Sequence, residues 1–205
     1  MSILVHHLRI GRSIFTVWLL EELGVAYDLK IYVRNAHGRA PPELKDAHPL
    51  GKSPVIEIDG FTLAESGAIA LYLAETRDPN GRFTPPPSGP ARGRWLQWLH
   101  YPEASAYTPL LISLLLKREQ EPKPGLVSMF AAGEVALQLD HIDAQLGDDA
   151  FILGDSMTLP DFGMTYMLSF AERLGLLRDY PRLRSYVERN MARSAFQRAL
   201  ARTGG

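Results

Sequence analysis

Three short segments in the first third of the chain carry residues that could bind or activate a small ligand. The first is Ile10–Ser13, where an arginine and a serine stand at the expected start of a helix. A helix N-terminus presents free N–H groups and a partial positive charge, which stabilise anions, including thiolates. Arg12 adds a permanent cation and Ser13 a hydroxyl donor. Taken alone, the pair is more typical of a capping serine beside a solvated arginine.

The second segment, residues 48–56, contains the tripeptide Gly-Lys-Ser, which is part of the phosphate-binding loop pattern. That pattern needs another glycine five positions before Gly51, where Asp46 stands, and a helix after the serine. Pro54 and the apolar residues after it predict a strand instead. A proline at the start of a strand suits a cis peptide bond, which would leave the backbone of Ser53 free to pair with an extended ligand. An ordinary proline at a strand start is the alternative.

The third segment, residues 63–69, runs from an expected strand directly into a helix. Ser66 is predicted to cap that helix, whose N-terminus is a ready site for a carboxylate. Glu65 beside it could pair with an ammonium group. One carboxylate site next to one ammonium site matches the head group of an α-amino acid. An isolated Glu-Ser pair is more often a cap with an incidental acid, so the prediction depends on the three segments occurring together.

The composition argues against several classes of function. The chain has 205 residues, no cysteine and a net charge of −1. Without cysteine there is no disulfide, thiolate metal site or cysteine nucleophile, so any sulfur chemistry must use the sulfur of a ligand. The balanced charge offers no electrostatic footprint for nucleic acid or an anionic membrane. No apolar run predicts a transmembrane helix, and the opening residues predict a strand rather than a signal peptide, so we expect a cytoplasmic protein.

Six histidines are spread along the chain without the spacing of metal ligands, so no metal site is predicted. His6 and His7 occupy adjacent positions of an expected strand and therefore face opposite sides. Either could approach a bound ligand, but a histidine satisfied within the structure is the more common case. Neither a Gly-x-Gly-x-x-Gly after a strand nor a Gly-x-Ser-x-Gly elbow is present, which argues against a dinucleotide site and an α/β-hydrolase.

Hydrophobic periodicity and turn signals divide the chain into two expected domains. The N-terminal part predicts strand, helix, strand, short helix, hairpin and helix, over residues 3–7, 13–23, 27–33, 42–47, 55–63 and 66–75. A helix between two strands predicts a parallel right-handed pair, to which the hairpin adds antiparallel strands. The predicted fold class is α/β plus all-α, with a thioredoxin-like domain over 1–78, a proline-rich linker over 79–90 and an all-helical bundle over 91–205.

The C-terminal part is expected to be helical throughout. The predicted helices cover residues 91–118, 126–146, 158–174, 181–191 and 194–202. Pro102 and Pro109 each remove a backbone donor from the first of these helices and should kink or interrupt it. A bent core helix and a helix bowed to open a groove are both consistent with this pattern.

Residues 18–25, 48–56 and 63–69 together resemble the N-terminal signatures of the cytosolic glutathione S-transferase superfamily. The resemblance covers nearly the whole chain and is nearest to bacterial and fungal members with an opening His-His-Leu and an Ala-Pro-Pro-Glu-Leu segment, here Ala40–Leu44. In the C-terminal part, Met157–Phe162 resembles the buried helix-capping motif of the superfamily. Thr158 at the N-cap and Asp161 three residues later can also satisfy the free N–H groups of a helix start on physical grounds alone.

The resemblance implies that glutathione is the cosubstrate and that no metal or further cofactor is needed. Its γ-glutamyl head group would lie at Glu65 and Ser66, and its cysteinyl backbone would pair with Ser53 beside a cis Pro54. Lys52 would meet a carboxylate. The thiol would then point at the start of the first helix, and the enzyme would be a homodimer.

The chain departs from the usual catalytic patterns of the superfamily. Tyrosine-type members carry their catalytic tyrosine at a position that aligns with His6, and many serine-type members have their serine close to Gly11. Neither is present, so Arg12 and Ser13, with the helix N-terminus, are predicted to stabilise the thiolate. A second-substrate pocket between the domains is predicted to use Tyr101, Tyr107, Leu111 and Phe170, although aromatic residues at helical spacing are more often core.

The expected activity is transfer of glutathione to small hydrophobic electrophiles, as in a detoxification enzyme, and reduction of organic hydroperoxides is a further activity consistent with the resemblance. Two alternatives remain open on the sequence alone. One is a dedicated catabolic enzyme on the same scaffold, and the other is a non-catalytic glutathione-transferase-like binding or regulatory protein.

Overall fold

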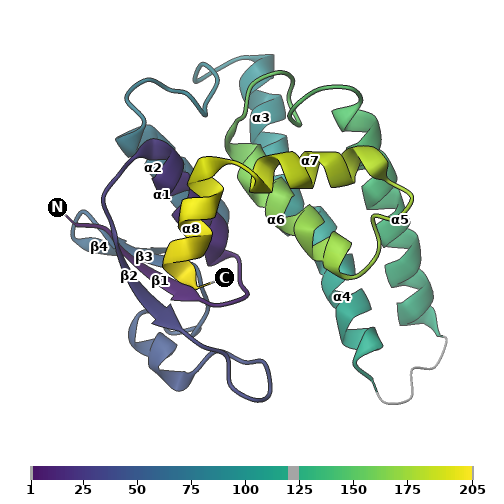
Figure 1. The fold of residues 1–205 in the computed structure, drawn as a ribbon, viewed down its shortest axis with the longest axis horizontal. Coiled ribbons are helices and arrows are strands. Elements are labelled where there is room, and N and C mark those ends of the chain that lie inside the picture. The colour runs from purple at the N-terminus through teal and green to yellow at the C-terminus, as the bar shows by residue number, and fades with distance from the viewer. Residues whose placement is uncertain (1, 120–124, 205) are drawn as a thin grey trace. The chain divides into compact units, whose positions relative to one another are not determined.

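The computed structural model describes residues 2–119 and 125–204, and the chain divides into two compact units. The first unit is Met1–Phe83 together with Met191–Gly205, and the second is Thr84–Asn190. Figure 1 follows the chain from the N-terminus to the C-terminus. The division near Phe83 falls inside the predicted linker, but the C-terminal helix clusters with the first unit, whereas the sequence had grouped it with the helical bundle.

A four-stranded sheet organises the first unit. Its strands are β1 (Leu4–Leu8), β2 (Asp28–Tyr32), β3 (Val55–Ile58) and β4 (Phe61–Ala64), in the order β2-β1-β3-β4. β1 and β2 run parallel, and β3 is antiparallel to both β1 and β4. The strand–helix–strand unit and the hairpin therefore form as predicted, and the thioredoxin-like fold is confirmed.

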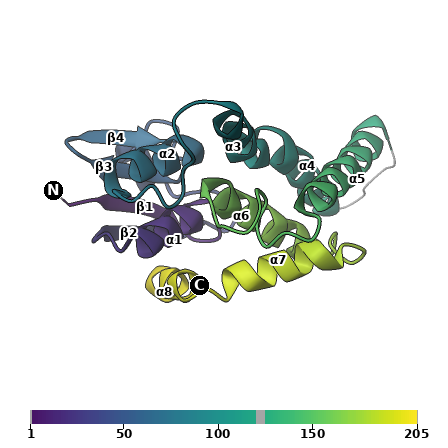
Figure 2. The ribbon, with the colours of Figure 1, turned by 90° about the horizontal axis from the view of Figure 1, so that it is seen from above.

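Helical segments complete the core of the first unit. They are α1 (Ser13–Leu23), the 3₁₀ turn η1 (Pro42–Asp46), α2 (Ser66–Arg77) and the C-terminal α8 (Ser194–Thr203). α1 ends where Gly24 adopts φ 68°, a left-handed conformation that glycine reaches without strain. Trp18 and Leu19 of α1 are fully buried, as is Val5 of β1. α8 packs beside α1, as Figures 1 and 2 both show.

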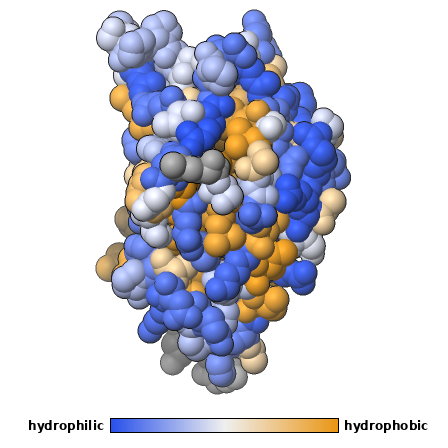
Figure 3. Space-filling view, turned by 90° about the vertical axis from the view of Figure 1, so that its left-hand side faces the viewer, coloured by the Kyte–Doolittle hydropathy of each residue, from blue (hydrophilic) through white to orange (hydrophobic). Residues whose placement is uncertain are grey.

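The exposed surface of the first unit is mixed in polarity. Val33, Leu50 and Phe61 are large apolar residues that remain exposed. Figure 3 shows hydrophobic areas between hydrophilic ones on one face of the molecule. Among the helices of the described residues, none is long and apolar enough to cross a bilayer.

The second unit is all-helical, as predicted. Its helices are α3 (Pro90–Tyr101), the π-helical segment η2 (Pro102–Ala106), α4 (Tyr107–Lys117), α5 (Leu126–Leu146), α6 (Leu159–Arg173) and α7 (Pro181–Met191). α3 packs beside α6, and α4 packs beside α5. Residues 120–124, part of the connection expected after the helix over 91–118, lie outside the described residues.

The two prolines of the first predicted helix behave differently. Pro102 begins the π-helical segment, so the expected interruption occurs there. Pro109 lies in the first turn of α4 and does not interrupt it. α4 continues directly from the π-helical segment, whose last residue Ala106 is itself helical, so the interruption expected from the two prolines takes the form of one π-helical segment between α3 and α4.

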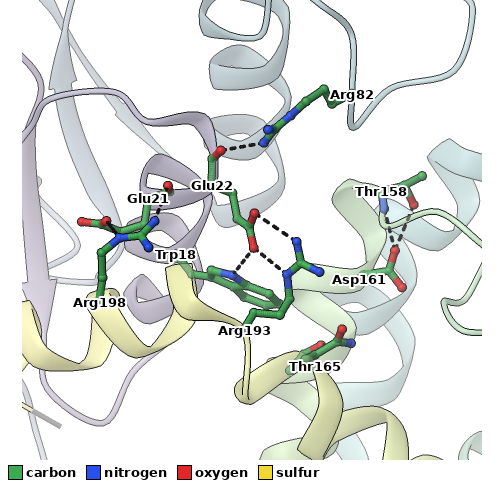
Figure 4. A network of polar contacts seen from close by, with 10 residues as sticks. Trp18, Glu21, Glu22, Arg82, Thr158, Asp161, Thr165, Arg193 and Arg198 are labelled. Carbon is green, nitrogen blue, oxygen red and sulfur yellow. Dashed lines mark hydrogen bonds and ion pairs between the residues drawn. The ribbon is translucent and has the colours of Figure 1, made fainter.

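Asp161 fixes the start of α6. Its carboxylate accepts hydrogen bonds from the backbone N–H of Thr158 (2.8 Å) and of Ile152 (3.0 Å), and from the hydroxyl of Tyr186 (2.7 Å). The Asp161 side chain is fully buried, and Figure 4 shows its bonds to Thr158. The predicted capping role of Thr158 and Asp161 is therefore confirmed as a structural one.

Candidate functional site

The three ligand-binding segments predicted from the sequence meet at one end of the sheet. The turn Arg9–Arg12 follows β1, Ser53–Pro54 precedes β3, and Glu65–Ser66 follows β4. Because β3 runs antiparallel to both neighbours, its beginning lies beside the ends of β1 and β4. The pairing of Val55 with His6 on one side and with Ala64 on the other brings the three segments together.

A shared backbone donor joins the first two segments directly. The N–H of Leu8 lies 3.2 Å from the Oγ atoms of both Ser13 and Ser53. Ser53 in turn donates its hydroxyl proton to the carbonyl of His6 at 2.8 Å. The Ser53 side chain is therefore engaged with β1, which leaves its backbone, and not its hydroxyl, as the group available to a ligand.

The segment before β3 has the local geometry predicted for it. The Ser53–Pro54 peptide bond is cis. Pro54 is buried, Ser53 is half-buried and Lys52 is exposed at the surface. Gly51 has φ 57°, so the residue before Lys52 adopts a left-handed conformation that favours glycine.

The segment after β4 places a strained residue at the start of α2. Glu65 has φ 71° and ψ 118°, a conformation that costs a non-glycine residue about 1–3 kcal/mol. Its side chain is exposed, and within the described part of the chain it makes no capping hydrogen bond to α2. Ser66 is the first helical residue and is buried, so the prediction that Ser66 is the N-cap is wrong by one residue. Backbone strain of this kind is concentrated at ligand-binding sites.

Ser13 is held inside the protein at the start of α1. It has 0% exposure, and its Oγ lies 3.0 Å from Nδ1 of His7. Burial, followed by the charge of Arg9, lowers the pKa of His7 to about 4, so His7 is neutral at pH 7. The Ser13 hydroxyl then donates to Nδ1 or, when Nδ1 carries the proton, to the Leu8 carbonyl at 3.4 Å.

Arg12 occupies the N-cap position of α1 and is half-buried, so its charge stands at the positive end of the helix dipole. The chain reaches it through a tight turn, in which Ile10 has φ 55° and is 67% exposed. A Cβ atom added to Gly11 would lie 2.8 Å from the Leu8 carbonyl oxygen, so only glycine fits there. The turn is therefore constrained at both residues before Arg12.

The two histidines of β1 face opposite sides of the sheet, as predicted. Nε2 of His6 donates to the Glu57 carboxylate at 2.8 Å, and its Nδ1 lies 2.9 Å from the hydroxyl of Tyr32. His7 bonds to Ser13 on the other side. Both rings are thus satisfied within the first unit, which matches the structural interpretation.

The residues predicted to line an electrophile pocket come from three helices of the second unit, α3, α4 and α6. Tyr107 and Phe170 are in contact, with ring centroids 5.4 Å apart. Leu111 lies one turn after Tyr107 on α4 and is exposed. Tyr101 instead donates to Gln138 of α5 and packs against another ring of α3.

Sequence reasoning missed one aromatic residue of this unit. Tyr166 stacks on Tyr107 with centroids 6.1 Å apart and is half-buried. Its position four residues before Phe170 on α6 was the available signal, because residues at that spacing share a helix face. In the described ranges, no group of three or more His, Asp or Glu side chains could hold a metal ion.

Comparisons with known proteins found matches to both parts of the chain. The family model described as glutathione S-transferase, N-terminal domain, matches residues 2–75, and the model described as glutathione S-transferase, C-terminal domain, matches residues 120–189. Glutathione S-transferase 3 of Schizosaccharomyces pombe is 34% identical over 184 residues, which cover 83% of this chain and 75% of that protein. The two models between them match most of the chain.

Solved structures show the same fold. A glutathione S-transferase from Actinobacillus pleuropneumoniae has a TM-score of 0.87 at 33% identity, covering 100% of this chain and 94% of that chain. A sphingomonad glutathione S-transferase complexed with glutathione has a TM-score of 0.80 at 23% identity, covering 98% of each chain. At that identity the second likeness is one of fold alone.

Proposed function

Because the chain belongs to the glutathione S-transferase family, we propose that it binds glutathione in its N-terminal unit and activates the thiol as a thiolate for attack on small hydrophobic electrophiles. The observation that carries the proposal is the meeting of three segments at one end of the sheet. The Leu8 N–H, which lies 3.2 Å from the Oγ atoms of both Ser13 and Ser53, joins the segment that would face the thiol to the segment that would pair with the cysteinyl backbone.

Each segment takes one part of the tripeptide. The start of α2 at Ser66 offers N–H groups to the α-carboxylate of the γ-glutamyl residue, and the exposed Glu65 carboxylate pairs with its ammonium group. The backbone of Ser53, beside Pro54, pairs with the cysteinyl backbone. The exposed ammonium of Lys52 meets a carboxylate of the ligand. The sphingomonad relative of the same fold, which is complexed with glutathione, supports this assignment of the ligand.

The thiolate is stabilised at the start of α1 by Arg12, Ser13 and the helix dipole. Lowering a thiol pKa from about 8.5 by two units requires about 2.7 kcal/mol of preference for the thiolate. A helix end contributes up to ~2 kcal/mol, and a hydrogen bond from a charged donor such as Arg12 contributes about 1.5–3 kcal/mol. The helix end and the Arg12 hydrogen bond together supply enough free energy. Ser13 contributes less, because its hydroxyl is already hydrogen-bonded to β1.

The thiolate then attacks an electrophilic carbon, adding to it or displacing a leaving group, and peroxide reduction is a further reaction of the same thiolate. The electrophile is held by apolar side chains of the helical unit, among them Tyr101, Tyr107, Leu111 and Phe170. The proposal also includes a cytoplasmic homodimer. Its support is a row of large exposed apolar side chains on α5, namely Leu126, Val127, Met129, Phe130 and Leu137.

The test is retention on immobilised glutathione followed by conjugation of a chromogenic aryl halide. Retention with turnover is expected. One observation favours a second candidate, a non-catalytic glutathione-binding protein: the Ser13 hydroxyl is satisfied by His7 and Leu8 and is not held ready for a thiol. Retention without turnover of aryl halides, alkyl halides or hydroperoxides would favour that candidate. If the protein showed neither retention nor turnover, both the enzyme and the binding-protein candidates would be wrong.

A further inference from the structure

The turn between β1 and α1 is held by a side chain from elsewhere in the first unit. Arg34, which follows β2 by two residues, donates from Nε to the Arg9 carbonyl at 3.2 Å and from Nη2 to the Ile10 carbonyl at 2.9 Å. Its Nη1 donates to the Gly38 carbonyl at 2.9 Å. One guanidinium thus joins the turn before α1 to the loop after β2, and all three of its nitrogens are used.

The conformation that Arg34 holds is not one the turn would adopt easily. Ile10 is β-branched and has φ 55°, which is a costly backbone conformation for such a residue. With 67% of its surface exposed, the Ile10 side chain gains little from burial that would offset this cost. Gly11 fits only because it lacks a Cβ, which would lie 2.8 Å from the Leu8 carbonyl oxygen. The hydrogen bonds from Arg34 therefore stabilise a turn whose backbone conformation is otherwise unfavourable.

Because Arg34 holds two backbone carbonyl groups, it also orients two backbone N–H donors. A trans peptide unit is planar, and its N–H points opposite to its C=O. By fixing the carbonyls of Arg9 and Ile10, Arg34 fixes the direction of the N–H groups of Ile10 and Gly11. The same turn leads directly into Arg12 and the first turn of α1, where Phe15 N–H donates to the Arg12 carbonyl at 3.2 Å.

We propose that Arg34 is a positioning residue for the thiolate site: its three-way hydrogen bonding keeps the Arg9–Gly11 turn in the conformation that aims Arg12 and the start of α1 at the sulfur of glutathione. This inference rests on the proposed function. Arg34 acts through the turn and does not itself touch the sulfur. This role requires the planar donor geometry of the guanidinium as well as its charge. An ammonium group cannot donate to two neighbouring carbonyls and a third one in a fixed geometry.

The test compares Arg34→Ala, Arg34→Lys and the control Arg39→Ala. Arg39 is an exposed arginine of the same loop, so the control removes the same charge nearby. Arg34→Ala is expected to raise the pKa of the bound glutathione thiol by about one unit, and to lower kcat/KM at neutral pH by about tenfold or more, chiefly through kcat. Arg34→Lys should behave like the alanine variant, and Arg39→Ala like the wild type. The pKa is read from the ultraviolet absorbance of the thiolate as a function of pH.

Hydrogen exchange without glutathione provides a readout that does not depend on activity. Arg34→Ala and Arg34→Lys should accelerate exchange of the amides from Ile10 to Ser13, while the amides of β3 stay protected as in the wild type. Full recovery in Arg34→Lys would show that charge alone matters and would overturn the inference. If the wild-type protein ionises bound glutathione and Arg34→Ala does so with the same thiol pKa, the inference is overturned but the proposed function stands. Wild-type protein that binds no glutathione would overturn both.

Discussion

Glu22 and Arg193 form a two-point ion pair that joins α1 to the segment just before α8. Nε and Nη2 of Arg193 lie 2.6 Å and 3.1 Å from the two carboxylate oxygens of Glu22, and Trp18 donates its indole N–H to the same carboxylate at 3.1 Å. Figure 4 shows the three side chains together. Phe196 adds an edge-on contact with Trp18 at 5.2 Å between centroids. A charged pair and an aromatic pair thus bind the two ends of the first unit's chain to each other.

Removing Arg193 should destabilise the first unit. Arg193→Ala leaves the Glu22 carboxylate, whose side chain is only 10% exposed, with Trp18 and without its cation. A hydrogen bond to a charged group contributes about 1.5–3 kcal/mol, and we expect the free energy of unfolding to fall by about 2 kcal/mol. Chemical denaturation measures it. Arg178→Ala, which removes an exposed arginine of the second unit, serves as the control and should change stability by less than about 0.5 kcal/mol.

The contribution of this pair should depend on pH in a defined direction. Burial raises the pKa of Glu22, but the hydrogen bonds and charge of Arg193 outweigh it, so the pKa is lower than usual. A carboxyl whose pKa is depressed by folding stabilises the protein above its unfolded pKa, and this stabilisation is lost as the pH falls through the folded pKa. The stability difference between wild type and Glu22→Gln should therefore be complete at pH 7 and shrink in acid. A difference that grew as the pH fell would contradict this assignment.

Local sequence signals predicted the segments of the site but not how they are joined. Glu65, Ser66 and Pro54 were found because strand ends, helix starts and proline leave short-range patterns. The engagement of the Ser53 hydroxyl with β1 was not predictable, because it depends on β1 pairing with β3, more than forty residues away along the chain. The register of that pairing sets which backbone groups of β1 the Ser53 hydroxyl meets.

Ion pairs between residues far apart in the sequence could not be predicted from local patterns either. Nothing in the spacing of Glu22 and Arg193 connects them, since 171 residues separate the two. Arg34 was one arginine in a loop rich in glycine and charge, and only the fold reveals that three carbonyls surround its guanidinium. Helices could be located from periodicity because that pattern repeats locally, whereas α8 docks on α1 through contacts that no local pattern contains.

The start of α6 offers a second stability test, in the helical unit. Asp161→Ala would leave the buried N–H of Ile152, the half-buried N–H of Thr158 and the buried hydroxyl of Tyr186 without the carboxylate that accepts from them. Buried unsatisfied donors cost about 1–3 kcal/mol each, so a loss of about 3–5 kcal/mol is expected after partial relaxation. Asp155→Ala, at an exposed aspartate of the same loop, is the control. Thermal unfolding should show a large decrease in Tm for the first variant and little change for the second.

Two glycine-to-alanine substitutions should act in opposite directions. At Gly11 the added Cβ would lie 2.8 Å from the Leu8 carbonyl oxygen, which is backbone and cannot rotate away. Gly11→Ala should therefore destabilise the first unit and reduce glutathione affinity. At Gly93, inside α3, nothing lies within 4 Å of the added atom, and alanine is the better helix former. Gly93→Ala should raise stability by about 0.5–1 kcal/mol. Similar effects at the two positions would mean that the Gly11 turn is not as tight as described.

The two residues at the start of α1 should separate in a mutational test, because the structure gives them different surroundings. Arg12→Ala removes the half-buried cation at the helix start and is expected to raise the pKa of the bound glutathione thiol by about one unit, with near-normal folding. Ser13→Ala removes an acceptor of the Leu8 N–H and the partner of His7, so its main effect should be a stability loss of about 1–2 kcal/mol. The pH dependence of kcat/KM distinguishes the two: its acid limb should move clearly to higher pH in Arg12→Ala and only slightly in Ser13→Ala. If the limb moved only in Ser13→Ala, the hydroxyl and not the guanidinium would be the group that stabilises the thiolate, by donating a hydrogen bond to the sulfur.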